Sequence, residues 1–135
     1  MLRDNMKLVG KLSIAVNDEI VQEVNNLVVT TGKNYVASRI KDATATAMSH
    51  MAIGTGSTSP AAGDTALGNE SARVALTSTT VTNADVAYVA SFGAGTGTGA
   101  ITEAGLFNSS SAGTLFCRTT FSVVNKGADD SMTIT

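Results

Sequence analysis

Glycine-rich stretches are the first residues that could do chemistry, because glycine loops can wrap the phosphates of a nucleotide. Four glycines alternate with other residues in one stretch: Gly93, Gly95, Gly97 and Gly99. A dinucleotide-binding loop needs a glycine three positions after its second one, and Thr98 occupies that position. Gly54 and Gly56 form a shorter stretch, and no Gly-Lys pair has the upstream glycine of a P-loop. The sequence therefore predicts turns here and no nucleotide cofactor.

Serine, histidine and cysteine could supply a nucleophile and its base, but His50 is the one histidine and Cys117 the one cysteine. No G-x-S-x-G sequence occurs. His50 stands among apolar residues, which is typical of a packed structural histidine. Cys117 is expected to be a small buried side chain without a partner that lowers its pKa. These counts also exclude a multi-histidine metal site, a thiolate cluster and an intramolecular disulfide.

Paired carboxylates occur at Asp18-Glu19 and at Asp129-Asp130. Such pairs hydrolyse glycosides when a cleft holds them at a fixed separation. Both pairs fall in expected turns, where acidic side chains usually accept hydrogen bonds from nearby backbone N–H groups. Neither pair has the spacing of a calcium-binding loop. The sequence therefore predicts a protein that is not an enzyme, with no catalytic, cofactor-binding or metal-binding residues.

Arg73 and Glu103 each stand in an expected strand of otherwise apolar or small residues. A charge buried in such a strand requires a partner. Our hypothesis is that the two side chains pair with each other, or that they cap backbone groups of the loop 54–67 and fix it against the sheet. The alternative is that both side chains point to solvent.

The composition narrows the class of protein. The chain has 135 residues, enough for about one domain, with a net charge of -2 and a pI near 5.2. It therefore lacks the basic surface that nucleic acid binding requires. Only 15% of the residues are charged, against about 25% in a typical soluble domain. The polar surface must consist mostly of Thr, Ser, Asn and Gly, which cost less to dehydrate than ions.

The start of the chain and its apolar runs bear on membranes and targeting. The first residues carry charge where a signal peptide needs an apolar core, and no stretch approaches the length of a membrane span. We therefore expect no membrane partner and synthesis in a cytoplasm.

Short strands are expected along most of the chain. Residues 7–16 alternate between apolar and polar side chains, and residues 20–24 follow after a turn. Asn25-Asn26 is expected to break the run before a strand at 27–31. Thr31 is expected to cap one short helix over 32–41. Further strands are expected at 50–54, 73–81, 86–92, 100–107, 114–124 and 131–135.

This order of elements predicts an all-β fold, an antiparallel β-sandwich of about 7–9 strands with one short α-helix. A parallel α/β fold would need a helix between most strands. We expect a single domain over residues 1–135, in which residues 1–7 can extend as an arm. A long loop over 55–67 holds the one proline, Pro60.

An ordered series of residues resembles a known family. The series comprises Ser49-His-Met-Ala-Ile-Gly-Thr-Gly56, Ser59-Pro60, Asp64-Thr-Ala-Leu67, Asn69-Glu70, Arg73 and Ile101-Thr-Glu-Ala-Gly-Leu-Phe107. It is similar to the N-terminal module of phage tail-collar fibre proteins, in which a MAVGDG…P…T.L.NE..R stretch precedes a REVGLFD stretch. The similarity covers roughly residues 48–125. It yields these structural and assembly candidates: Gly54, Gly56, Pro60, Asp64, Leu67, Arg73, Glu103, Gly105 and Phe107.

The resemblance implies a structural protein of a tailed bacteriophage virion, assembled in the host cytoplasm. Tail-collar fibre proteins continue into a shaft and a receptor-binding tip, whereas this sequence stops at Thr135. It therefore implies an attachment module without the fibre. The first expectation is a capsid cement or decoration protein that binds the major capsid protein. The alternative is a tail or baseplate adaptor, or a tail-fibre attachment protein, that binds tail or baseplate proteins.

A protein that binds a lattice and its neighbours needs a neutral, easily dehydrated surface and free strand edges more than it needs a pocket. We therefore expect a homo-oligomer, for example a trimer, with the arm 1–7 and the loop 55–67 as contact segments. The few charges are expected on the face left to solvent. A carbohydrate-binding module is the other class considered, but no Trp, two Tyr and four Phe offer few rings for sugar stacking.

Overall fold

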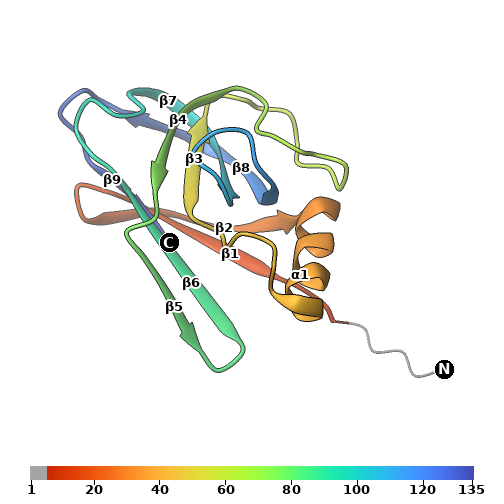
Figure 1. Ribbon diagram of the computed structural model, residues 1–135. Helices are drawn as coiled ribbons and strands as arrows, with labels where there is room; N and C mark the ends of the chain where they lie inside the picture. The colour runs from red at the N-terminus through yellow and green to blue at the C-terminus, as the bar shows by residue number, and fades with distance from the viewer. Residues whose placement is uncertain (1–5) are drawn as a thin grey trace.

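The computed structural model describes residues 6–135, and in this part of the chain nine strands and one helix form (Figure 1). In chain order they are β1 (Gly10–Val16), β2 (Glu19–Val28), α1 (Thr30–Asp42), β3 (His50–Gly54), β4 (Glu70–Ala75), β5 (Ser78–Thr82), β6 (Asp85–Phe92), β7 (Gly99–Phe107), β8 (Leu115–Lys126) and β9 (Met132–Ile134). The predicted all-β class with one short helix is confirmed.

The strands form one continuous sheet in the order β4-β3-β7-β8-β2-β1-β9-β6-β5, and every neighbouring pair is antiparallel. The sheet curls so that β4, at one edge, contacts β6 near the other edge. The main core lies inside the curl, where Ile53 and Ile101 from one half meet Ile14 and Phe92 from the other. The two layers of the expected sandwich are thus two halves of a single sheet.

The two halves join between β2 and β8, where only Leu27 and Val28 of β2 pair with β8. Further along, the two strands diverge, and side chains cross the gap in place of backbone ladder bonds. The Thr119 hydroxyl donates to the Asn25 carbonyl at 2.9 Å. This divergence allows the sheet to bend there.

Three expected strand boundaries are wrong. The strand expected over 27–31 ends at Val28, because helix α1 begins at Thr30. β2 continues through Asn25 and Asn26, because both residues pair with β1 and the ladder outweighs their local turn preference. The expected strand 73–81 is two strands, because the chain leaves β3 after Ala75 and pairs with β6 from Ser78 onward.

Helix α1 begins at Thr30, and the expected cap by Thr31 is wrong. The residue before the helix is Val29, which makes no side-chain cap. The Thr31 hydroxyl instead donates to the Leu115 carbonyl of β8 at 2.8 Å. The helix ends where Ala43 takes a left-handed conformation, with φ of 56°.

The helix lies directly against β8. Gly32 is buried, and a Cβ atom there would collide with the Phe116 carbonyl oxygen. Tyr35 packs edge-on against the Phe116 ring, with 6.0 Å between ring centroids. Close approach of helix and strand therefore depends on the missing side chain at position 32.

The arm expected over residues 1–7 falls mostly outside the described residues. Met6 and Lys7 are exposed and precede β1. Among the residues that the structure describes, no helix combines the length and apolar character needed to cross a membrane.

Replacing Gly32 with alanine tests the docking of α1. The added methyl group must push the helix away from the Phe116 carbonyl, and overpacking of this kind costs roughly 1 to 3 kcal/mol. We expect Gly32→Ala to lower the free energy of unfolding by about that amount in urea titrations. Gly63→Ala is the matched control, because nothing lies within 4 Å of a Cβ atom there. Equal stability of the two variants would contradict the proposed contact.

Candidate functional site

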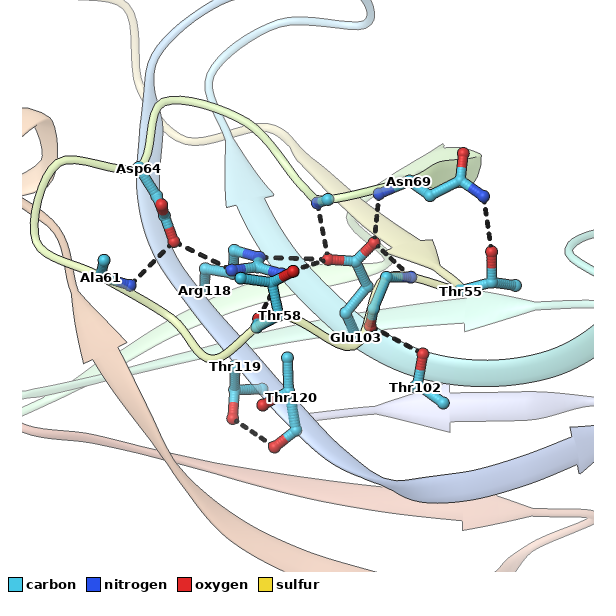
Figure 2. Close-up of polar contacts among 12 residues, drawn as sticks. Thr55, Thr58, Ala61, Asp64, Asn69, Thr102, Glu103, Arg118, Thr119 and Thr120 are labelled. Atoms are coloured by element: carbon cyan, nitrogen blue, oxygen red, sulfur yellow. Dashed lines mark hydrogen bonds and ion pairs between the residues drawn. The ribbon is translucent and has the colours of Figure 1, made fainter.

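The loop between β3 and β4, residues 55–69, lies over a buried ion pair from the neighbouring strands (Figure 2). Glu103 of β7 has 0% of its surface exposed and Arg118 of β8 has 2%. Arg118 donates to Glu103 Oε2 from Nη2 at 2.9 Å and from Nε at 3.1 Å. Both charges are therefore removed from water and neutralise each other.

The Glu103 carboxylate also binds the backbone of the loop near both its ends. Oε1 accepts the N–H of Gly56 at 2.9 Å and that of Asn69 at 2.7 Å, and Oε2 accepts the N–H of Gly68 at 2.8 Å. Next to Glu103, the Thr102 hydroxyl donates to the Gly56 carbonyl at 2.8 Å. One carboxylate therefore closes the loop at its start and at its end (Figure 2).

Arg118 holds the middle of the loop with its remaining donors. Nη2 donates to the Thr58 carbonyl at 2.9 Å, and Nη1 donates to Asp64 Oδ2 at 2.9 Å. The same Asp64 oxygen accepts the Ala61 N–H at 2.9 Å. Pro60 lies half-buried between these anchored residues. The loop is thus tied to the sheet along its length.

Two glycines leave room for the carboxylate. A Cβ atom would lie 2.6 Å from Glu103 Oε1 at Gly54 and 2.5 Å from it at Gly56. A side chain at either position would push the carboxylate away from the backbone groups that it binds.

The loop is also anchored by apolar packing near its end. Leu67 is buried in a small cluster with Phe107 and Leu115. A Cβ atom at Gly105 would lie 2.8 Å from Leu67 Cδ2, so Leu67 packs directly over the bare backbone of β7.

Both acids of the site are ionised at neutral pH. Burial favours the neutral form of Glu103, but the N–H groups of Asn69 and Gly68, together with Arg118, outweigh it and hold the pKa below its ordinary value of 4.5. The pKa of Asp64 is lowered chiefly by the N–H of Ala61, against opposing burial, with help from Arg118.

Arg73 belongs to a second cluster beside the first. Its guanidinium binds Glu70 with two hydrogen bonds, at 3.0 and 2.7 Å, and lies 3.7 Å above the centroid of the Phe107 ring. Nη1 also donates to the carbonyls of Ser109 at 3.0 Å and Ala112 at 2.8 Å. Arg73 therefore fastens β4 to the turn between β7 and β8.

The hypothesis that Arg73 pairs with Glu103 is wrong, since Glu103 pairs with Arg118 and Arg73 with Glu70. The alternative that both point to solvent is also wrong, because the Arg73 side chain is only 9% exposed and Glu103 is fully buried. The expectation that Glu103 caps backbone groups of the loop is confirmed at Gly56 and extends to the two residues just past the expected range.

Sequence reasoning missed Arg118. It stands between Cys117 and Thr119 in an expected strand of apolar and small residues. This is the same signal that singled out Glu103, so two such residues of opposite sign could have been considered together.

These contacts hold the loop 55–69 against strands β7 and β8. Every donor and acceptor described above is satisfied within the protein, and Cys117 has its pKa raised to about 12 by burial. His50 Nδ1 lies 2.8 Å from the Ser49 hydroxyl. Over residues 6–135, no group of three or more His, Cys, Asp or Glu side chains is placed to hold a metal ion.

No family model, no curated protein and no solved structure matches the chain.

Replacing Glu103 with glutamine tests how much the Glu103 carboxylate stabilises the loop. The change leaves the buried Arg118 with only the partly exposed Asp64 as a counter-charge and replaces one of the two carboxylate oxygens that accept N–H groups of the loop, and breaking a buried pair typically costs about 3 to 5 kcal/mol. We expect Glu103→Gln to lose roughly this much unfolding free energy in urea. Glu70→Gln, in the more exposed pair, should lose under about 1 kcal/mol. Equal losses would contradict a special role for Glu103.

Glu103→Gln should also change how the unfolding free energy depends on pH. The lowered pKa values of Glu103 and Asp64 stabilise the fold above their unfolded-state values, and this stability is lost as the pH falls through the folded-state values. The unfolding free energy of the wild type should therefore fall below about pH 4.5. The unfolding free energy of Glu103→Gln should fall less steeply as the pH is lowered. Parallel pH profiles for the variant and the wild type would contradict the lowered pKa of Glu103.

Proposed function

We propose that the protein is a non-enzymatic structural protein of a tailed bacteriophage virion, and specifically a capsid cement or decoration protein that binds the capsid lattice. Two features support the proposal. One is the ordered series of residues similar to the phage tail-collar module. The other, which carries the argument, is the contrast between the charged underside of the loop 55–69 and its neutral outer surface.

The outer surface of the loop consists of small, uncharged side chains. Its exposed residues are Thr55, Ser57, Thr58, Ser59, Ala61, Ala62, Gly63, Thr65, Ala66, Gly68 and Asn69. The one acid of the loop, Asp64, is engaged by Arg118. Such a surface costs little to dehydrate, because neutral groups hold water less strongly than ions.

The anchored backbone adds a second advantage for binding another protein. A flexible loop loses conformational entropy when it is ordered in an interface, whereas a loop already held in shape loses little. Glu103 and Arg118 hold this loop from beneath. Preorganisation of a neutral surface suits a protein whose role is to bind a lattice.

The alternative is a tail or baseplate adaptor, or a tail-fibre attachment protein. It is favoured by one observation: the series similar to the tail-collar module contains Gly54, Gly56, Asp64, Leu67 and Glu103, which together build the anchored loop. An attachment module could use the same loop to bind a tail protein.

The copy number in purified particles of the phage that encodes the chain separates the two roles. A cement protein should be stoichiometric with the major capsid protein or a simple fraction of it. A tail adaptor should be present in far fewer copies. Quantitative densitometry of the particle proteins measures this ratio, and absence of the chain from the particles would overturn both roles.

The loop itself can be tested by adding charge to it. Ser59→Glu/Thr65→Glu places two carboxylates on the exposed loop surface, where their burial against a partner is costly. We expect at least tenfold less incorporation into particles. Thr80→Glu/Thr82→Glu, on the exposed strand β5, is the matched control and should incorporate normally. Normal incorporation of the loop variant would contradict binding through the loop.

A further inference from the structure

Most of the exposed charges outside the loop clusters lie at two opposite ends of the molecule. One end, here called the acidic end, carries the exposed Asp18, Glu19 and Asp129 and the half-buried Asp130. The other, the basic end, carries Lys7, Lys33, Arg39 and Lys41. Lys11 and Glu23 lie between them on neighbouring strands, and the exposed Asp85 is the first residue of β6.

The acidic end consists of two turns bonded to each other. Asn17, in the β1–β2 turn, donates from Nδ2 to Asp130 Oδ1 at 3.0 Å and accepts the Ser131 N–H on Oδ1 at 3.0 Å. The bond from Asn17, followed by the N–H of Gly127, lowers the pKa of Asp130. Beneath these turns lies the buried ammonium of Lys126, a single positive charge that does not cancel four carboxylates.

A groove lies beside the acidic end. It opens where β2 and β8 diverge, has a volume of about 340 Å³ and is lined by four valines, Val16, Val21, Val123 and Val124, together with Gln22 and Asn125. Val21 is 47% exposed, Val123 52% and the neighbouring Ile20 63%. This end therefore combines an apolar centre with a negative rim.

The basic end has the complementary composition. Ile40 on the last turn of α1 is 69% exposed and lies between Arg39 and Lys41 in sequence. Arg39 donates to the carbonyls of Ala43 and Ala45. These neutral acceptors position the guanidinium without offsetting its positive charge. The one acid on this helix, Asp42, pairs with Lys41 at 3.3 Å and offsets its charge, so Lys7, Lys33 and Arg39 give this end its net positive charge.

The chain segment before β1 extends the basic end. Leu8 packs against the same buried cluster as Tyr35 of α1, so Lys7 lies beside the helix. Met6 is 68% exposed and Val9 81%. This end also combines apolar side chains with a rim of one charge, here positive.

One molecule cannot bring its two ends together. They lie at opposite ends of β1 (Figure 1), which has seven residues and so spans roughly 20 Å. Complementary surfaces on opposite ends of one chain fit a second copy in a head-to-tail contact.

We propose that the protein self-associates head to tail, with Ile40 and its flanking Arg39 and Lys41 seated in the acidic end of the next copy. Ile40 would occupy the valine-lined groove, while the basic residues face Asp18 and Glu19. Because the two surfaces differ, the contact repeats into a closed ring or an open chain. The inference goes beyond the virion role and stands on the surface of the chain alone. The proposal places these charges in the subunit contact. The composition predicts instead that they lie on the face left to solvent.

Charge reversal with complementation tests the contact on the purified full-length protein. Glu19→Lys/Asp129→Lys removes the net negative charge of the acidic end, and Lys33→Glu/Lys41→Glu removes the net positive charge of the basic end, because each leaves two acidic and two basic side chains among the four named at that end. We expect the wild type to associate at low ionic strength and to dissociate as salt screens the rims. Each double variant should associate at least tenfold more weakly, because one of the two contacting ends then no longer carries a net charge opposite to that of the other. An equimolar mixture of the two variants should recover association. Sedimentation velocity and light scattering measure these masses.

The matched control is Glu23→Lys/Asp85→Lys, which changes the net charge as much as Glu19→Lys/Asp129→Lys, but Glu23 pairs with Ser13 in the middle of β1 and Asp85 begins β6. This control should associate like the wild type. A monomeric wild type at low salt, association unaffected by either double variant, or a mixture that stays monomeric would each overturn the contact. Particle copy number tests the virion role separately, so failure of one proposal is distinguishable from failure of the other.

Discussion

The structure depends on one buried carboxylate, Glu103, and on what neutralises it. Moving an ion out of water costs several kcal/mol, and a single counter-charge seldom offsets this cost. Here Arg118 is joined by three backbone N–H groups of the loop, so that both carboxylate oxygens are satisfied. A buried pair of this kind contributes little net stability compared with an apolar replacement. The pair instead holds the loop in one conformation, whereas an unanchored loop would sample many conformations.

Other features of the loop follow from that requirement. The loop can approach the carboxylate only because Gly54 and Gly56 lack side chains, and Leu67 can pack on β7 only because Gly105 does. The charged groups are therefore used inside the molecule, and the outer surface of the loop is left to Ser, Thr, Ala and Gly. At this loop, charged side chains hold the backbone from the inside and neutral side chains face outward.

The sequence predicted the features that local pattern controls. Alternation located most strands, and the helix was expected within two residues of its observed start. The features that depend on distant partners could not be predicted in this way. Asn25 and Asn26 form strand because β1 pairs with them, and the curl of the sheet arises where β2 and β8 diverge. Glu103 was recognised as needing a partner, but the register that places Arg118 beside it is a tertiary property.

The most direct measurement of the central claim is the hydrogen exchange of the backbone amides of Gly56, Gly68 and Asn69 near neutral pH. These amides belong to a loop, and in an unanchored loop they would exchange almost as fast as in an unfolded chain. The account predicts that all three are strongly protected, because each donates to the buried carboxylate of Glu103. Exchange at unprotected rates in the folded protein would show that Glu103 does not hold the loop.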